Sequence, residues 1–297
     1  MDVAITGSHG LVGRPLIQAL RADGHRVLRL VRGEPEGADD VRWDPVVGTI
    51  DSGRLEGVDA VVHLAGAGIG DRRWTAARKE LILDSRVRST ELLAGALAAL
   101  DRPPAVLVSA SAIGAYGSRG DEPLTEASSR GTDFVAGVCE RWEQSTQAAE
   151  AAGIRVVHVR SGIVLARGGG LLGRLLLPFR LGLGGRSGSG RQYLSWIAID
   201  DEVGAIRHVL TSSVAGPVNL TAPRPVTNRE FTAALGRAVH RPAVLPTPVW
   251  PLRLVYGPEL VEHLLLGGQR VLPAALEQSG YRFAHSEIDG ALGALLG

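Results

Sequence analysis

The chain has 297 residues, a formal net charge of +1 and 45% hydrophobic residues, which predicts a globular protein with a substantial core. So small a net charge excludes the broad basic surface that nucleic-acid binding requires. The single cysteine, Cys139, excludes an intramolecular disulfide and metal sites built on paired cysteines. The N-terminal apolar run stops at the first glycine, and no apolar run is long enough to cross a bilayer. We therefore expect a cytoplasmic protein with no membrane partner.

The first thirteen residues carry the strongest local pattern. An apolar run over 3–6 leads into glycines three residues apart, and a helical pattern follows through Leu20. Glycines in such a turn let the backbone adopt positive φ and let a phosphate come close, while the new helix directs its N–H groups to the same place. The pattern predicts a nucleotide site, rather than an ordinary strand–helix turn, formed by Gly7, Ser8, His9, Gly10, Leu11, Val12 and Gly13.

A second strand is expected over 26–31, and Arg32 follows it directly. In a dinucleotide fold this is where the adenosine ribose lies. An acidic residue there accepts a bond from the ribose 2′-hydroxyl, whereas an arginine can hold a 2′-phosphate. Arg32 therefore favours NADP over NAD. The alternative is a solvated loop arginine, and Glu34 two residues later keeps that alternative open.

A short strand is expected over 41–43, and residues 59–66 are typical of a buried parallel strand. Leu64, Ala65 and Gly66 at its end leave room for a ligand at the edge of the sheet. We interpret His63 as a core histidine, because no second metal-binding side chain stands at ligand spacing beside it. A long helix is expected over 74–100.

The next strand, over 105–108, runs into a segment rich in hydroxyl groups. Ser109, Ser111 and Tyr116 follow it in order. Side chains at the carboxyl end of a central parallel strand lie near the reactive end of a bound nicotinamide, so these residues are candidates for the reaction site. The alternative is a serine-rich turn that satisfies its own backbone.

The rest of the chain completes an alternating pattern of helices and strands. We expect a helix over 134–152, a strand over 155–160, a helix over 202–210 capped by Asp200 or Asp201, and a strand over 217–220. After Pro223 the pattern changes to short helices, beginning with a capping box at 227–230. The fold class predicted is α/β: a Rossmann-like doubly wound parallel sheet over 1–222, with a small, mainly helical C-terminal domain over 223–297.

Several motifs occur in an order that is more specific than any one glycine pattern, at 6–13, 63–66, 72–74, 84–86, 109–111, 178–185, 188–192 and 227–231. With these motifs the chain resembles the extended and atypical short-chain dehydrogenase/reductases, in an NAD(P)-dependent epimerase-like branch that ends in a domain of unknown function. The resemblance covers nearly the whole chain. It implies NADP(H) over the three glycines, Arg32 at the 2′-phosphate and Leu64-Ala65 near the ribose. It also implies that Arg86, which stands where the superfamily usually has an asparagine, contacts the cofactor. Ser109, at the end of its strand, is a further expected cofactor contact.

The chain departs from this superfamily at the catalytic residues. Superfamily dehydrogenases use a tyrosine as acid/base together with a lysine four residues later, because a free tyrosine with a pKa near ~10 is a poor proton carrier at neutral pH. Lys79 is the only lysine, and none of the four tyrosines has a lysine four residues on. Residues 134–138, expected to carry the pair, contain neither. Ala198 also replaces a histidine that the branch usually has, so a substrate role at that position is not expected.

Two functions remain open. In the first, the protein is an NADP-dependent oxidoreductase or epimerase-like enzyme, in which Ser111 or Tyr116 positions the oxygen of an unknown small-molecule substrate and an arginine such as Arg160 supplies the missing positive charge. In the second, it binds NADPH without turnover, as a redox sensor or interaction module. The long helices after the fourth and fifth expected strands are candidates for a homodimer contact, as in relatives of the family.

Overall fold

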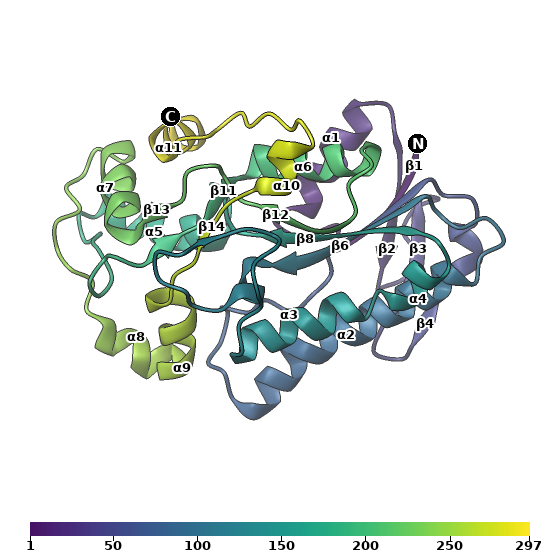
Figure 1. Cartoon of the computed structure of the whole chain (residues 1–297), viewed down its shortest axis with the longest axis horizontal. Helices are drawn as coiled ribbons and strands as arrows, with labels where there is room; N and C mark the ends of the chain where they lie inside the picture. Colours follow the sequence, from purple (N-terminus) through teal and green to yellow (C-terminus); the bar gives the residue numbers. More distant parts are fainter.

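The computed structural model describes residues 1–297, and its centre is one eight-stranded sheet. Its strands are β1 (Asp2–Thr6), β2 (Arg26–Val31), β3 (Asp40–Asp44), β4 (Thr49–Ile50), β5 (Ala60–His63), β6 (Val106–Ala112), β8 (Arg155–Ser161) and β12 (Gly216–Leu220). Their order is β12-β8-β6-β5-β1-β2-β3-β4 (Figure 1). All neighbours are parallel except β3 and β4. The order reverses at β1, which is the topological switch point at which doubly wound sheets bind ligands.

Helices cover both faces of this sheet (Figure 1). α1 (Gly13–Ala22) and α6 (Ile199–Thr211) pack on one face, where Val3 and Ile5 of β1 enter their core. α2 (Ala76–Ala98), α3 (Phe134–Gln144) and α4 (Gln147–Ala151) lie on the other, where Ala4 joins residues of α2 and α4. Successive side chains of a strand point to opposite faces, so both faces are apolar and the strands read as continuous apolar runs. The predicted Rossmann-like fold class is confirmed.

The expected helix over 134–152 is wrong in one respect, because it is broken between α3 and α4. Ser145 Oγ donates to the Arg141 carbonyl at 2.7 Å, and Thr146 Oγ1 donates to the Glu143 carbonyl at 2.8 Å. Hydroxyl side chains that bond back to helix carbonyls compete with the regular backbone ladder. These two bonds accompany the end of α3.

The expected N-cap at Asp200 or Asp201 is also wrong. α6 begins at Ile199, and its N-cap residue, Ala198, makes no side-chain cap bond. The Asp201 carboxylate instead accepts the backbone N–H groups of Ala284 at 2.7 Å and His285 at 2.9 Å. This buried carboxylate therefore fastens the C-terminal segment to the start of α6.

The region after the main sheet consists of short elements. The helices are α5 (Gly170–Arg180), α7 (Asn228–Ala238), α8 (Val249–Tyr256), α9 (Pro258–Leu260), α10 (Ala274–Gln278) and α11 (Ile288–Leu296), with single turns η1 (Ser52–Leu55), η2 (Ile113–Tyr116) and η3 (Val261–Leu266). Two-stranded pairs join β7 (Pro123–Leu124) to β14 (Arg270–Val271), β9 (Ile163–Leu165) to β11 (Trp196–Ala198), and β10 (Tyr193–Leu194) to β13 (Val226–Thr227). The predicted capping box is confirmed: Thr227 and Glu230 exchange both bonds at the start of α7.

The C-terminal region and the sheet share part of one core. Leu276 of α10 is fully buried in the same cluster as Val3 and Ile5 of β1. Residues of β14 pair with the loop strand β7, which precedes α3 in the chain. The division at 222–223 stays a prediction, since the second segment contributes to the core of the first.

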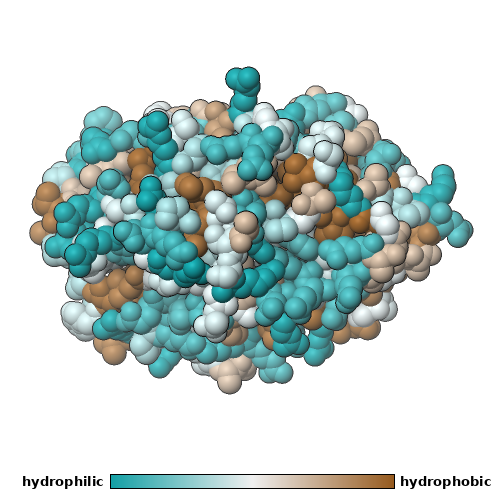
Figure 2. Space-filling model, viewed as in Figure 1, coloured by the Kyte–Doolittle hydropathy of each residue, from teal (hydrophilic) through white to brown (hydrophobic).

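The surface drawn in Figure 2 is mostly hydrophilic, with separate hydrophobic patches. The exposed apolar side chains include Trp250, Leu254 and Val255 of α8. None of the helices combines the length and the apolar character that a membrane span requires.

Candidate functional site

The glycine turn between β1 and α1 is built so that no side chain fits inside it. Gly7 has φ +69°, and a Cβ placed on it would lie 2.8 Å from the carbonyl carbon of Leu64. A Cβ on Gly13 would lie only 2.2 Å from the Gly7 carbonyl oxygen. Gly10 N–H donates to that same oxygen at 2.9 Å and closes the turn. The result is a bare backbone surface at the N-terminus of α1, which suits a phosphate group.

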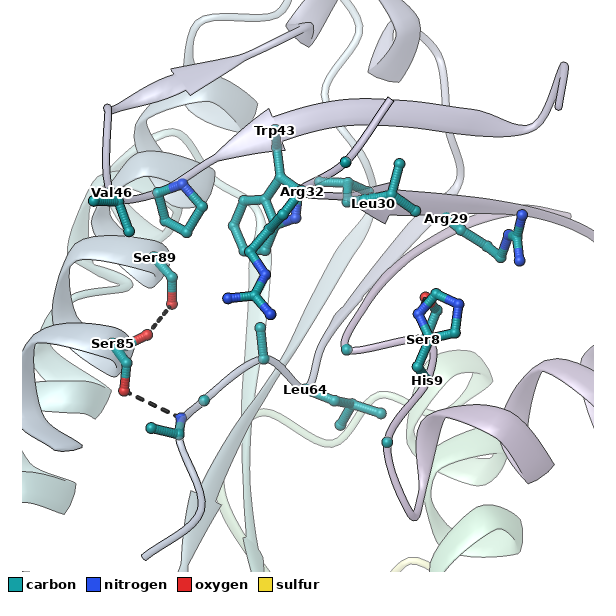
Figure 3. A pocket seen from close by; sticks show the side chains of 18 of the residues that line it. Ser8, His9, Arg29, Leu30, Arg32, Trp43, Val46, Leu64, Ser85 and Ser89 are labelled. Carbon is teal, nitrogen blue, oxygen red and sulfur yellow. Dashed lines mark hydrogen bonds between the residues drawn. The ribbon is translucent and has the colours of Figure 1, made fainter. Parts of the chain in front are cut away.

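Beside this turn is a cavity of about 870 Å³. It is bounded by the glycine turn, the ends of β2 and β5, the segment after β3, and one face of α2 (Figure 3). Eight of the predicted cofactor residues line it together: Gly7, Ser8, His9, Gly10, Arg32, Leu64, Ala65 and Gly66. Other residues on its wall were not predicted from the sequence, notably Arg29 of β2, Trp43 of β3, and Ser85, Arg88 and Ser89 of α2. Only the fold brings β3 and α2 to this place.

Arg32 is the arginine of this cavity that no protein group neutralises. Its side chain extends from the end of β2 into the cavity, between Ser85 and Ser89 of α2 and the Ser8-His9 segment (Figure 3). The neighbouring arginines are paired: Arg29 with Asp40, Arg88 with Asp84, and Arg42 with Glu34. Glu34 is thus engaged elsewhere, and Arg32 presents a free positive charge to a ligand.

His63 is confirmed as a core histidine. Its ring is fully buried, and its nitrogens lie 2.7 Å from Thr6 Oγ1 and 3.0 Å from Thr90 Oγ1. Burial lowers the pKa of His63 to about 4, so the ring is neutral at pH 7. Thr6 Oγ1 also accepts the backbone N–H groups of Leu64 and Ala65, at 3.0 and 3.1 Å. The histidine therefore helps to hold the strand end that forms the floor of the cavity.

A second cluster of polar side chains lies at the ends of β6, β8 and β12. Ser111 Oγ donates to Glu143 Oε1 at 2.6 Å, and Arg160 donates to both oxygens of Glu143, at 2.8 and 2.9 Å. Arg160 Nη1 also donates to the Tyr116 hydroxyl at 3.0 Å, and that hydroxyl donates to Asn219 Oδ1 at 2.7 Å. All five side chains are buried. Arg130, whose side chain is partly exposed, also donates to Glu143 Oε2. The cluster is a closed network in the sense that each polar group of these five side chains has a protein partner.

The charges inside this network stabilise one another. Burial alone would raise the pKa of Glu143, but the hydrogen bonds and charge of Arg160 lower that pKa to about 2. Burial alone would lower the pKa of Arg160, and Glu143 instead raises it above the ordinary value. Burial raises the pKa of the Tyr116 phenol, and Arg160 opposes that rise only in part. At neutral pH the network therefore holds a carboxylate, a guanidinium and a neutral phenol.

The structure places most of the predicted site residues either in the cavity wall or in the polar network. Ser111 and Tyr116 belong to the closed network and not to the cavity lining, and Tyr116 is fully buried. Ser109 is also fully buried, and its Oγ has no hydrogen-bond partner. Leu11 packs against the loop at 169–170, whose glycines leave room for it. Glu143 and Asn219, which complete the network, carry no signal in the sequence that marks them.

Arg86 lies next to the cavity rather than in its wall. It projects from α2 toward Gly66 and stacks over the ring of Trp142 of α3, with Cζ 4.8 Å from the ring centroid. No group of three or more His, Cys, Asp or Glu side chains is placed to hold a metal ion.

The residues present fit a dinucleotide. The side-chain-free turn suits a pyrophosphate, the cavity beyond it suits an adenosine, and Arg32 would then lie at the adenosine ribose. The ends of β5 and β6 on the other side of the turn would then face the nicotinamide half.

Comparison with known sequences decides the family. The pattern of the NAD dependent epimerase/dehydratase family matches residues 3–221, and a domain of unknown function, DUF1731, matches residues 247–295. The chain belongs to the NAD dependent epimerase/dehydratase family. A member of this family from Mycobacterium tuberculosis, epimerase family protein MT2273, is 48% identical over 292 residues, covering 98% of this chain and 96% of that protein.

Two solved structures of this family are similar over the whole chain. The crystal structure of human epimerase family protein SDR39U1 (isoform 2) with NADPH matches with a TM-score of 0.91 and 36% identity, covering 100% of this chain and 99% of that one. A nucleoside-diphosphate sugar epimerase from Corynebacterium glutamicum matches with a TM-score of 0.82 and 39% identity, covering 100% of this chain and 58% of that one. The predicted epimerase-like family with its C-terminal domain of unknown function is confirmed.

Proposed function

We propose that this family member binds NADP(H), with the pyrophosphate on the glycine turn and the 2′-phosphate on Arg32. The observation that carries the proposal is that Arg32 points into the cavity without a protein anion, while Glu34 pairs with Arg42. Arginine suits a phosphate because its planar guanidinium donates two parallel bonds. The NADPH in the human relative supports the same assignment.

We further propose that the protein is an oxidoreductase or epimerase-like enzyme acting on a small molecule. Bound NADP(H) supplies a hydride acceptor or donor. Of the two predicted catalytic residues, Ser111 lies on β6 near its carboxyl end, and the Tyr116 hydroxyl accepts a hydrogen bond from Arg160. For either to position a substrate oxygen, the network around Glu143 would have to open.

A second function is favoured by the closure of that network. Ser111, Tyr116 and Arg160 are buried and fully engaged with protein groups, as expected of a structural brace. In this case the protein binds NADP(H) without turnover and signals its redox state or occupancy to another molecule.

The first experiment is calorimetric titration of cofactor-free protein with NADPH, NADP, NADH and NAD. Preferential binding of the phosphorylated pair supports the proposal, and equal binding of all four contradicts the role of Arg32. A screen of carbonyl and alcohol compounds for NADPH oxidation or NADP reduction then separates the two functions. If turnover is found, an unchanged rate in Tyr116→Phe removes Tyr116 from the mechanism.

A further inference from the structure

Two arginines near the carboxyl edge of the sheet have different environments: Arg160 is buried, whereas Arg86 is partly buried. Arg160 shares its charge with both oxygens of Glu143 and bonds to Tyr116. Arg86 makes one hydrogen bond to the protein, from Nη1 to the Ile82 carbonyl of its own helix, at 3.0 Å. A guanidinium has five N–H groups, so most of the donors of Arg86 remain available.

The Arg86 guanidinium is nevertheless held in a defined place. It stacks on the Trp142 ring on one side, with Cζ 4.8 Å from the centroid. On another side it faces Gly66, where a Cβ would lie 3.4 Å from Cζ. Gly66 follows β5 and also lines the cofactor cavity. The cation therefore lies beside the cavity, between the end of β5 and α3.

No carboxylate forms an ion pair with Arg86. Burial lowers its pKa, and among the ionisable groups that act on it the Cys139 thiol raises that pKa while Arg78 lowers it further. Burial raises the pKa of Cys139 to about 11, so the thiol is uncharged at neutral pH. Buried charges in proteins are normally paired, because an unpaired one loses hydration without compensation. A partly desolvated guanidinium with no carboxylate partner points to an anionic ligand.

Arg78 adds a second incompletely used donor. It stands two turns before Arg86 on α2, and its Nη2 donates to the Gly68 carbonyl. Its Nε is enclosed and has no hydrogen-bond partner. Asp71 lies 3.9 Å from Arg78 Nη2, but that carboxylate bonds more closely to Arg174, at 2.7 Å. Asp71 therefore does not fully neutralise Arg78, and the segment after β5 has an excess of positive charge around it.

The cofactor itself does not account for Arg86. If NADP(H) binds as proposed, its pyrophosphate lies on the glycine turn and its 2′-phosphate on Arg32, at the opposite side of the cavity. Both anionic parts of the dinucleotide then have their own sites. The charge of Arg86 remains for a third anion.

We propose that Arg86, assisted by Arg78, binds an oxyanion of the substrate, a carboxylate or a phosphate, next to the nicotinamide half of the bound cofactor. This inference rests on the proposed NADP(H) binding and names the substrate class of the same site. The Trp142 stack fixes the plane of the guanidinium, and a fixed fork of donors favours two-point binding of an oxyanion. A neutral substrate would leave the partly buried charge of Arg86 without a counter-ion.

The test uses NADPH-loaded protein, so that the glycine turn and Arg32 are occupied. Inorganic phosphate and acetate are titrated separately at constant ionic strength, with chloride as the balancing anion, and binding is followed by ligand-observed NMR and calorimetry. We expect saturable binding of at least one anion to the wild type. We expect Arg86→Gln to weaken it at least about 10-fold, since a charged hydrogen bond is lost.

Arg141→Gln is the matched control, because Arg141 carries the same charge on the exposed face of α3. Arg86→Lys keeps the charge but lacks the paired N–H donors of a guanidinium, and it serves as a second variant if Arg86→Gln does not fold. It should bind the anion more weakly than the wild type. Whichever anion binds more tightly identifies the oxyanion. No binding of either anion to NADPH-loaded wild type, or equal binding by wild type and both Arg86 variants, overturns the inference.

NADPH titrations of the same variants separate the two proposals. Arg86→Gln should keep the NADPH affinity of the wild type. If it loses NADPH affinity instead of anion affinity, Arg86 is a cofactor contact and the oxyanion site is wrong, while NADP(H) binding stands. If the wild type itself binds no NADPH, the proposed function fails.

Discussion

The Arg160 guanidinium and the Glu143 carboxylate form a two-point ion pair, with N–O distances of 2.8 and 2.9 Å, inside the carboxyl edge of the sheet. Both side chains are almost completely buried. The pair joins α3 to β8, and through Tyr116 and Asn219 it reaches β12. The Glu143–Arg160 pair thus connects α3, β8 and β12 at the place where the reaction site was expected.

Removing one half of this pair should destabilise the protein strongly. Glu143→Gln keeps the shape but leaves the buried Arg160 cation without its counter-charge, which costs about 3–5 kcal/mol in comparable cases. Urea unfolding measures the change. Glu140→Gln, on the exposed side of the same helix, is the control and should change the unfolding free energy by less than about 0.5 kcal/mol. Equal effects of the two substitutions would show that the pair contributes little.

The same carboxylate gives the protein an acid-sensitive stability. The pKa of Glu143 is about 2 in the folded protein and near 4.5 ordinarily, so the unfolded chain takes up the proton first as pH falls. The stabilising contribution is complete above about pH 4.5 and is lost as pH falls toward 2. Unfolding free energies measured across this range should decline more steeply in the wild type than in Glu143→Gln.

Glu202 should make the unfolding free energy depend on pH in the opposite direction, and at higher pH. Its side chain is buried at the start of α6, where Ser161 Oγ donates to Oε1 at 2.6 Å and Oε2 has no partner. Burial raises its pKa to about 7 from 4.5. Between these values the folded protein holds a proton that the unfolded chain has lost, so stability falls as pH rises. The total loss is at most about 3 kcal/mol.

Glu202→Gln tests that slope, because it keeps the neutral form at every pH. Its unfolding free energy should change less than that of the wild type between pH 5 and pH 8, a window chosen around the pKa of about 7. The variant should also be the more stable of the two at the upper end. Parallel pH profiles would show that Glu202 ionises without cost.

Gly13→Ala should disrupt the cofactor turn. Its Cβ would lie 2.2 Å from the Gly7 carbonyl oxygen, so the turn or the start of α1 must shift. We expect a loss of about 1–3 kcal/mol in stability and a large loss of NADPH affinity. Gly137→Ala is the control, since no atom lies within 4 Å of its Cβ position in α3. That substitution should be neutral or stabilising by about 0.5–1 kcal/mol.

Arg32→Ala should change cofactor preference rather than cofactor binding in general. The loss of a charged contact to the 2′-phosphate should weaken NADPH by about 10-fold or more and leave NADH nearly unchanged. Calorimetric titration of both cofactors measures the difference. Arg21→Ala, which removes the same charge from the exposed far end of α1, should affect neither. Equal losses for NADPH and NADH in Arg32→Ala would contradict the 2′-phosphate assignment.

The glycine turn and the strand ends were predictable because they depend on local sequence. Gly7 and Gly13 are needed by backbone geometry within one turn, and Arg32 directly follows an apolar strand. The Glu143–Arg160 pair could not be predicted, since its partners are 17 residues apart and the sheet register decides which side chains meet. The free charge of Arg86 was hidden for the same reason: only the packing of α2 against α3 shows that no carboxylate reaches it.

The incorrect prediction of Asp201 as an N-cap also results from a tertiary contact that the local sequence does not show. An aspartate beside a helix start normally caps that helix, and the sequence shows no sign that another segment competes for the carboxylate. In the fold, Ala284 and His285 arrive from more than 80 residues away and take it. Local preference was overridden by a tertiary contact.

The attachment of the C-terminal segment also bears on how the protein can be divided. Leu276 fills a space among residues of β1 and α6, and Asn219 Nδ2 donates to the Leu272 carbonyl at 3.0 Å. A fragment ending at residue 222 would open an apolar hole beneath its own sheet and leave Asp201 buried without its backbone donors. The last quarter of the chain therefore stabilises the Rossmann-like sheet by packing back against it, and an insertion or fusion at the 222–223 junction must leave this segment long enough to reach the sheet.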